Sequence, residues 1–469
     1  MSGFNSNNNN RSFGGYQGGG RGRGRGYQGG RGRNNGYQSH HEGRNNGYIA
    51  HHEAHPPLLK LCANFSMDGT CQYGERACNF KHAVTRLFDI DASTSMKQGG
   101  SGTGRYGNNG GRWNGGGGGN DVEKEPVSSM AIWVEGGAAM GAGVSVPPIK
   151  LFSASHDGCW RLWDSANSFS EIFKVEMGGK LRALVVSNNF LFCGFEKNCP
   201  LTPGTKVGMI HAWNLLTPQA PPLEFHAGDP TSVPFAHGSC ITALLPIPDA
   251  TGVAIVSASE DCLIKVWRFD AGRFSVAHTL IGHVGSVTGI TQPAGAPTVL
   301  WSSSKDTTIR IWDLVSGKCG GVLLKDGHTG EVTSVLAWAS DMGSFVFSSS
   351  MDGSVIAWGS ADGKKLATET HGKGVLCIAT TKDEGGNPLL VCGLEHGKIM
   401  VRALPGPSGM APLTLVFTID KFRGGHMGAV HAVEAGEGPV GIFYSAGKDG
   451  KIKVWQIQGN LAQMAQAQN

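Results

Sequence analysis

The chain has 469 residues, a net charge of +4 and 73 glycines, about twice the usual glycine share. Without a long apolar run or an apolar N-terminus we expect neither a membrane span nor a secretory signal. The eleven cysteines, mostly scattered singly, do not form a disulfide framework and favour a reducing compartment. We therefore expect a soluble intracellular protein of the nucleus, the cytoplasm or both.

The N-terminal segment, residues 1–59, holds seven arginines against two glutamates and almost no aliphatic side chains. Such a segment cannot offset the entropy of ordering, so we expect a disordered tail. Gly-Arg alternation at Arg21, Arg23 and Arg25, with tyrosine at every tenth or eleventh position, supplies cations for phosphates and flat rings for bases. The tail resembles the RGG-type segments of RNA-binding proteins. The alternative is a solvated tail without a specific ligand.

Residues 60–86 contain the most specific motif, Cys62-x8-Cys71-x6-Cys78-x3-His82. Three thiolates and one imidazole complete a tetrahedral Zn²⁺ shell without an open position for substrate. A segment this short takes most of its folding free energy from the metal. The sequence therefore predicts one structural zinc ion as the protein's cofactor.

The spacing is similar to that of the CCCH zinc-finger family. That resemblance implies that Phe65, Tyr73 and Phe80 stack on bases of single-stranded RNA and that Arg76 and Lys81 lie near phosphates. The alternative is that the three aromatic rings only pack against the zinc site.

Residues 87–126 are rich in Gly and Asn and predict a flexible linker. Within it, Arg105, Tyr106, Arg112 and Trp113 offer an alternative interpretation as a second RNA-contacting segment.

Residues 127–460 repeat at intervals of 44 to 54 residues, which indicates a repeat architecture. Apolar residues alternate with polar ones before each repeat tryptophan, as strands require. The tryptophans are Trp163, Trp213, Trp267, Trp312, Trp358 and Trp455. Arg402 occupies the tryptophan position of the sixth unit.

A second periodicity accompanies the tryptophans. Aspartates lie six residues before five of them: Asp157, Asp261, Asp306, Asp352 and Asp449. Histidines lie 29 to 31 residues before a tryptophan or its equivalent: His237, His283, His328, His371 and His426. This is similar to the WD-repeat pattern, which implies a mainly β, seven-bladed propeller. It also implies that His, Asp, a strand Ser or Thr, and Trp form a buried structural network in each blade rather than a catalytic set.

Three features of the repeats depart from that pattern or stay open. The second unit carries an insertion, Lys197–Val207, and lacks the aspartate, and the sixth has His396 in the aspartate position. The outer strand of the last blade is expected either from residues 459–469 or from the segment just before Val127. Residues 461–469 otherwise form a C-terminal tail.

The combination resembles plant-type CCCH/WD-repeat proteins. It predicts a non-enzymatic, zinc-dependent adaptor that binds single-stranded RNA through the tail and finger. Its propeller recruits protein partners, in RNA processing or turnover, and we expect no small-molecule substrate. The alternatives are a propeller scaffold with only non-specific nucleic-acid contact and a DNA-binding regulator.

Overall fold

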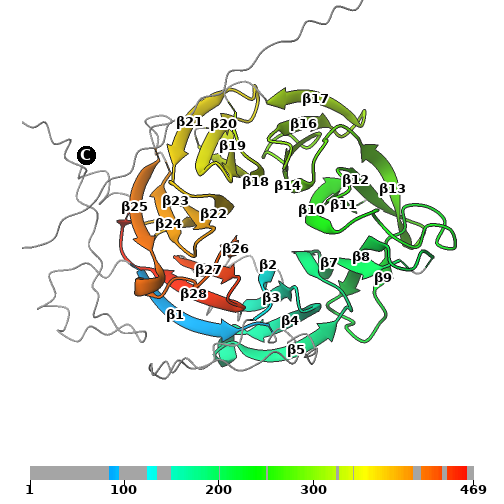
Figure 1. Cartoon of the computed structure of the whole chain (residues 1–469), viewed down its shortest axis with the longest axis horizontal. Coiled ribbons are helices and arrows are strands. Elements are labelled where there is room, and N and C mark those ends of the chain that lie inside the picture. The colour runs from blue at the N-terminus through cyan, green and yellow to red at the C-terminus, as the bar shows by residue number, and fades with distance from the viewer. Residues whose placement is uncertain are drawn as a thin grey trace, which may run out of the picture. The chain divides into compact units, whose positions relative to one another are not determined.

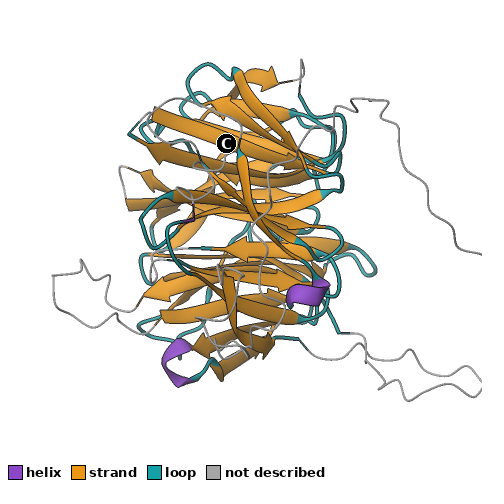
Figure 2. Ribbon diagram, turned by 90° about the vertical axis from the view of Figure 1, so that its left-hand side faces the viewer, coloured by secondary structure: helices purple, strands orange, loops and turns teal. Residues whose placement is uncertain are grey.

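Seven antiparallel sheets of four strands each are arranged as blades around a common axis (Figure 1). The computed structural model describes residues 84–93, 124–134, 149–199, 201–249, 252–323, 327–341, 343–404, 413–435 and 441–461. All of them lie in one compact unit. Seen edge-on, the strands fill the body of the ring and the turns gather at its two faces (Figure 2).

Each of the first six blades is a meander of four consecutive strands. Blade 1 comprises β2 (Val127–Val134), β3 (Ile149–Ser155), β4 (Cys159–Asp164) and β5 (Ser170–Glu176). Blade 2 comprises β6 (Leu181–Ser187), β7 (Phe190–Asn198), β8 (Lys206–Asn214) and β9 (Leu223–Glu224). Blade 3 comprises β10 (Ile241–Asp249), β11 (Gly252–Ser259), β12 (Ile264–Asp270) and β13 (Arg273–Leu280). Blade 4 comprises β14 (Val287–Thr291), β15 (Val299–Ser304), β16 (Ile309–Asp313) and β17 (Lys318–Leu323).

The remaining blades complete the circle. Blade 5 comprises β18 (Val332–Ser340), β19 (Gly343–Ser350), β20 (Ser354–Gly359) and β21 (Lys365–Thr370). Blade 6 comprises β22 (Val375–Lys382), β23 (Pro388–Leu394), β24 (Ile399–Ala403) and β25 (Thr414–Ile419). Blade 7 comprises β26 (Val430–Glu434), β27 (Ile442–Gly447), β28 (Lys451–Ile457) and β1 (Val84–Asp91). Two single 3-10 turns, η1 (Ser165–Asn167) and η2 (Lys421–Arg423), lie in loops.

Burial differs between the strands of a blade. The second strand of a blade is packed between neighbouring blades and is almost wholly buried, as in β3 and β23. The fourth strand is mostly exposed, as in β5 and β17. Strands buried on both faces therefore read as nearly continuous apolar runs, whereas outer strands are polar.

Ring closure corrects the predicted domain boundaries. The outer strand of blade 7 is β1, which pairs with β28 from Val84 opposite Ile457 to Asp91 opposite Lys451. The last three residues assigned to the finger and the first five assigned to the linker thus belong to the propeller. The glycine-rich composition of the predicted linker concealed this strand, whose own sequence, VTRLFDID, contains no glycine.

Long-range contacts hold β1 in place. Lys453 Nζ lies 3.2 Å from Asp89 Oδ1, and Arg86 donates to the carbonyl of Gly424 at 3.0 Å. Arg161 of blade 1 donates to the carbonyl of Ala92 at 2.8 Å. The strand therefore joins the last blade to the first and removes the free edge that β28 would otherwise present.

Candidate interaction surface

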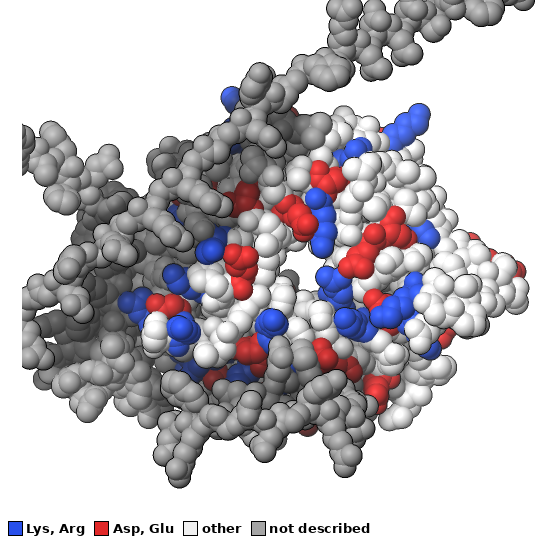
Figure 3. Space-filling model, in the orientation of Figure 1, with Lys and Arg blue, Asp and Glu red and all other residues white. Residues whose placement is uncertain are grey.

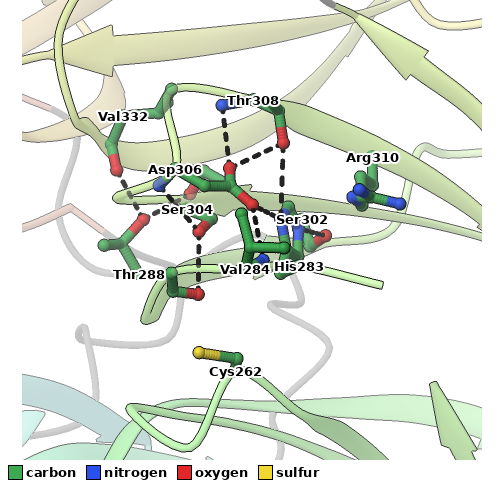
Figure 4. A network of polar contacts seen from close by, with 12 residues as sticks. Cys262, His283, Val284, Thr288, Ser302, Ser304, Asp306, Thr308, Arg310 and Val332 are labelled. Atoms are coloured by element: carbon green, nitrogen blue, oxygen red, sulfur yellow. Dashed lines mark hydrogen bonds and ion pairs between the residues drawn. The ribbon is translucent and has the colours of Figure 1, made fainter. Parts of the chain in front are cut away.

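The repeat histidine, aspartate, serine and tryptophan of blade 4 form one chain of hydrogen bonds, of which Figure 4 shows the part from Asp306 through His283 to Ser302. His283 Nδ1 lies 2.8 Å from Asp306 Oδ2, and His283 Nε2 lies 2.7 Å from Ser302 Oγ. Trp312 Nε1 donates to the same Ser302 oxygen at 2.8 Å. Each buried polar group of the chain thus has a partner, as a stable interior requires.

A closely similar arrangement recurs in three other blades, although in blade 5 His328 Nδ1 bonds Ser354 Oγ at 2.8 Å and lies 3.4 Å from Asp352 Oδ2. The sets are His237, Asp261, Ser257 and Trp267 in blade 3; His328, Asp352, Ser348 and Trp358 in blade 5; and His426, Asp449, Ser445 and Trp455 in blade 7. Four copies of one network, each closed by an indole, identify these residues as structural elements of the blades rather than as a single reaction centre.

The aspartates of these networks are stabilised as anions. Burial would raise the pKa of Asp306, but hydrogen bonds with His283 and Thr308 outweigh it and hold that pKa well below its usual range. Burial lowers the pKa of His237 against the opposing effect of Asp261. The folded structure therefore favours the ionised form of the carboxylate in the network.

Three blades lack the complete set. In blade 1, Arg161 pairs with Asp157 at 2.6 Å, and Trp163 still donates to Ser153 at 2.9 Å. In blade 2, Trp213 is only partly buried and packs with His211. These blades keep their four strands because β-sheet pairing and apolar packing do not depend on the network.

Blade 6 replaces the network with a different one. Arg402 Nε lies 3.0 Å from His371 Nε2, and Arg402 Nη1 lies 3.2 Å from Glu369 Oε2. Glu369 also accepts from the backbone of Leu413 at 3.1 Å. His396, in the aspartate position, lies in the turn between β23 and β24. The sequence indicated the substitution but not its partner Glu369.

A ring of residues around the axis was missed by the sequence analysis. It consists of the second residue of each inner strand: Ser128, Arg182, Thr242, Thr288, Thr333, Leu376 and His431. The four hydroxyl groups donate to a backbone carbonyl of the next blade, for example Thr288 to Val332 at 2.6 Å. In blades 3 to 7 the signal was present, because each of these residues follows a repeat histidine by five positions.

These seven residues line a cavity of about 340 Å³ at the axis. It opens on the face that carries the turns between the second and third strands of the blades, called the top face below. Those turns contribute His156, Glu260, Lys305 and Met351 to its rim. The cavity mouth is thus built from side chains of all seven blades.

Charges of both signs surround this mouth. Arg182 pairs with Glu260, and Lys305 Nζ lies 3.8 Å from Glu331 Oε2. Figure 3, viewed down the axis, shows basic and acidic side chains interspersed around the central opening on the face it presents. A second hollow, of about 380 Å³, lies between blades 1 and 2 and shares His156 with the mouth.

The comparisons with known proteins agree with this geometry. The family model described as "WD domain, G-beta repeat" matches residues 228–268, 274–313 and 317–359. The chain carries WD40 repeats in a seven-bladed propeller. The crystal structure of the WD40 β-propeller domain of Doa1 is similar to this WD40 propeller, with a TM-score of 0.51 and 19% identity over 71% of this chain and 93% of that chain. At that identity the likeness concerns the fold alone. A search of the curated proteins returned no match.

The predicted zinc ligands and nucleic-acid contacts lie outside the described residues. They are Cys62, Cys71, Cys78 and His82, and Phe65, Tyr73, Phe80, Arg76, Lys81, Arg21, Arg23 and Arg25. Within the part of the WD40 chain that the structure describes, no group of three or more His, Cys, Asp or Glu side chains is placed to hold a metal ion. The helices found there are two 3-10 turns, neither of which could cross a membrane.

Proposed function

We propose that the protein is a non-enzymatic adaptor whose WD40 propeller holds a protein partner at the mouth of its axial cavity. The predicted finger and Arg-Gly tail hold single-stranded RNA. The observation that carries the first half is the cavity mouth itself, where seven inner strands place charged, hydroxyl and apolar side chains together. Charges of both signs around the mouth suit a protein partner, because complementary charges orient it and exclude other partners.

The internal networks support a binding role. In blades 3, 4, 5 and 7 the histidine and aspartate side chains, which could otherwise perform acid–base chemistry, are bonded to serine and to one another. Their function is to stabilise the blades that present the top face. The exposed side chains at the mouth, such as Met351, remain available for a partner.

The proposed binding of a protein at the mouth is tested with a photo-crosslinking residue in place of Met351, which is 40% exposed there. The matched control carries the same residue in place of Leu216, which is 67% exposed after β8 and therefore on the opposite face. We expect discrete crosslinked proteins from the Met351 position that are absent from the Leu216 position. Equal yields from both positions would contradict binding at the mouth.

The proposed binding of single-stranded RNA rests on the spacing of Cys62, Cys71, Cys78 and His82 and on the arginines of the tail. It is tested by binding the full-length protein to short single-stranded RNA, with single- and double-stranded DNA as competitors, at two salt concentrations. We expect RNA to bind best and chelation of zinc to weaken binding. Substitution of Phe65 by Ala should weaken it about tenfold, since one base stack is worth about 1–3 kcal/mol.

The alternatives give different results in the same experiment. Equal binding of all polyanions that is insensitive to zinc and lost at moderate salt would leave only electrostatic contact by the tail. The protein would then be a propeller scaffold. Preference for duplex DNA would indicate a DNA-binding regulator.

A further inference from the structure

Three basic side chains lie on one arc of the cavity mouth. His431 of blade 7, His156 of blade 1 and Arg182 of blade 2 come from three consecutive blades and line the same cavity. Two of them, Arg182 and His431, occupy ring positions that carry a hydroxyl group in four of the other five blades. We refer to these three residues as the basic arc.

The two imidazoles of the basic arc differ from the repeat histidines in their hydrogen bonding. Among the described residues, neither His156 nor His431 has a side-chain hydrogen-bond partner, unlike the repeat histidines of blades 3, 4, 5 and 7. Arg182, by contrast, pairs on its blade 3 side with Glu260. The mouth therefore contains two imidazoles with open hydrogen-bonding positions beside one guanidinium.

Burial and neighbouring cations keep both imidazoles neutral. Burial, followed by Arg182, Lys180 and His431, lowers the pKa of His156 to about 4, against a weaker opposing effect of Glu196.

For His431, burial, followed by Arg182, Lys448 and His426, lowers the pKa, and Asp449 opposes the shift. An anion placed among the three groups would offset the repulsion that now prevents both imidazoles from being charged.

We propose that the basic arc binds a single anionic side chain, carboxylate or phosphate, of the protein partner. The inference rests on the proposed protein-binding function and specifies the chemistry of its central contact. As the anion enters, it accepts hydrogen bonds from Arg182 and from the two imidazoles, which take up protons from solvent. Charge-assisted hydrogen bonds of this kind are shorter and stronger than neutral ones.

The other charges at the mouth favour one anion over a polyanion. Glu260 and Glu331 lie on the rim of the same cavity, and Glu196 lies in the adjoining hollow. A nucleic-acid backbone crossing this face would bring several phosphates close to these carboxylates, whereas one acidic side chain at the basic arc meets only the nearest of them, Glu260 and Glu196. A protein segment therefore fits the site better than RNA.

Binding at this site depends on pH in a defined direction. Because protons are taken up, affinity rises as pH falls from the pKa of the bound imidazoles towards that of the free ones. One proton taken up corresponds to about a tenfold gain in affinity for each unit of pH within that window. A site built only from arginine would not gain affinity as pH falls, because its charge does not change in this range.

The test uses the full-length protein with ¹³C-labelled histidine, and His156→Gln and His431→Gln to assign the two imidazole signals. The probes are three blocked tripeptides, Gly-Glu-Gly, Gly-phosphoSer-Gly and Gly-Gln-Gly, and a short single-stranded RNA. We expect the glutamate or the phosphoserine peptide to raise the pKa of both imidazoles by about one unit or more. The stronger of the two identifies the chemistry of the partner's side chain.

Two variants control for a general loss of structure. Arg182→Gln should abolish the shift, whereas Lys305→Gln, on the opposite part of the same rim, should retain it. No shift with either acidic peptide, or the same shift in Arg182→Gln, would overturn the proposal, as would a larger Arg182-dependent shift with RNA.

The peptide titration and the crosslinking at Met351 fail independently. If an acidic peptide raises the pKa of both imidazoles but no protein is crosslinked at Met351, the adaptor function is contradicted and the anion site is supported. A crosslinked protein without an effect of either acidic peptide would leave the adaptor function standing and remove the anion site.

Discussion

At the scale of single residues, the residues at the repeat positions find polar partners in more than one way. Four blades use the histidine–aspartate–serine–tryptophan network, and blade 6 uses Arg402 with His371 and Glu369. Since a buried polar group without a partner costs about 1–3 kcal/mol, the identity of one member constrains the others. A residue that matches the repeat pattern is therefore favourable only where its partners are present.

Blade 6 provides a direct test of this dependence. Although tryptophan is the usual residue at this position, we expect Arg402→Trp to destabilise the protein by about 2 kcal/mol, because it leaves the half-buried Glu369 without its cation. Arg402→Lys should cost less, since it retains the charge. The measurement is the free energy of unfolding from denaturant titration, and a gain in stability for Arg402→Trp would contradict the assigned network.

The aspartates of the repeat networks predict a loss of stability in acid. The pKa of Asp306 and of Asp352 is lowered in the folded protein, so folding favours their ionised forms. Their contribution is present above the unfolded pKa of about 3.9 and is lost as pH falls through that value towards the folded pKa. Asp306→Asn should be less stable at neutral pH and lose less stability on acidification. A thermal midpoint measured across pH checks both expectations.

At the scale of elements, ring closure depends on one strand distant from the rest of its blade in sequence. β1 covers the outer edge of β28. Arg86 contacts the loop at Gly424, and Ala92, next to the end of β1, accepts a hydrogen bond from Arg161 of β4. Removing it would expose the edge of β28 together with the apolar surface that Ile90 covers. An exposed edge of this kind is a site of aggregation.

Two truncations that differ by ten residues test the closure. A fragment of residues 84–469 retains β1 and should unfold cooperatively at nearly the midpoint of the full chain. A fragment of residues 94–469 lacks β1 and should unfold at a lower temperature or aggregate. Thermal unfolding with light scattering distinguishes the two, and equal stability would show that another segment closes the ring.

At the scale of the whole molecule, the propeller's described contacts begin at Val84, after the last predicted zinc ligand. We therefore expect zinc removal to weaken RNA binding and to leave the propeller's thermal midpoint unchanged. Fluorescence of the buried tryptophans of blades 3, 4, 5 and 7 reports the propeller alone. A large fall in the midpoint on chelation would show that the finger and the propeller fold together.

Local sequence determined the fold class. The repeat spacing and the alternation before each tryptophan predicted seven blades, because a blade is a meander whose strands pair with their neighbours in the chain. The same pattern predicted the networks of blades 3, 4, 5 and 7, whose members recur at constant offsets. The zinc ligands and the RNA contacts also come from local spacing and stay predictions.

Only the tertiary structure decided which distant segments meet. The closing strand β1 lies more than 300 residues from its partner β28, and no local pattern links Ile90 to Ile452. The basic arc unites residues of three blades that are separate in sequence, and Glu369 of β21 becomes the partner of Arg402 of β24 in the neighbouring blade. Such contacts follow from closing the ring around its axis, a constraint that acts on the whole chain at once and leaves no periodic signal in any one segment.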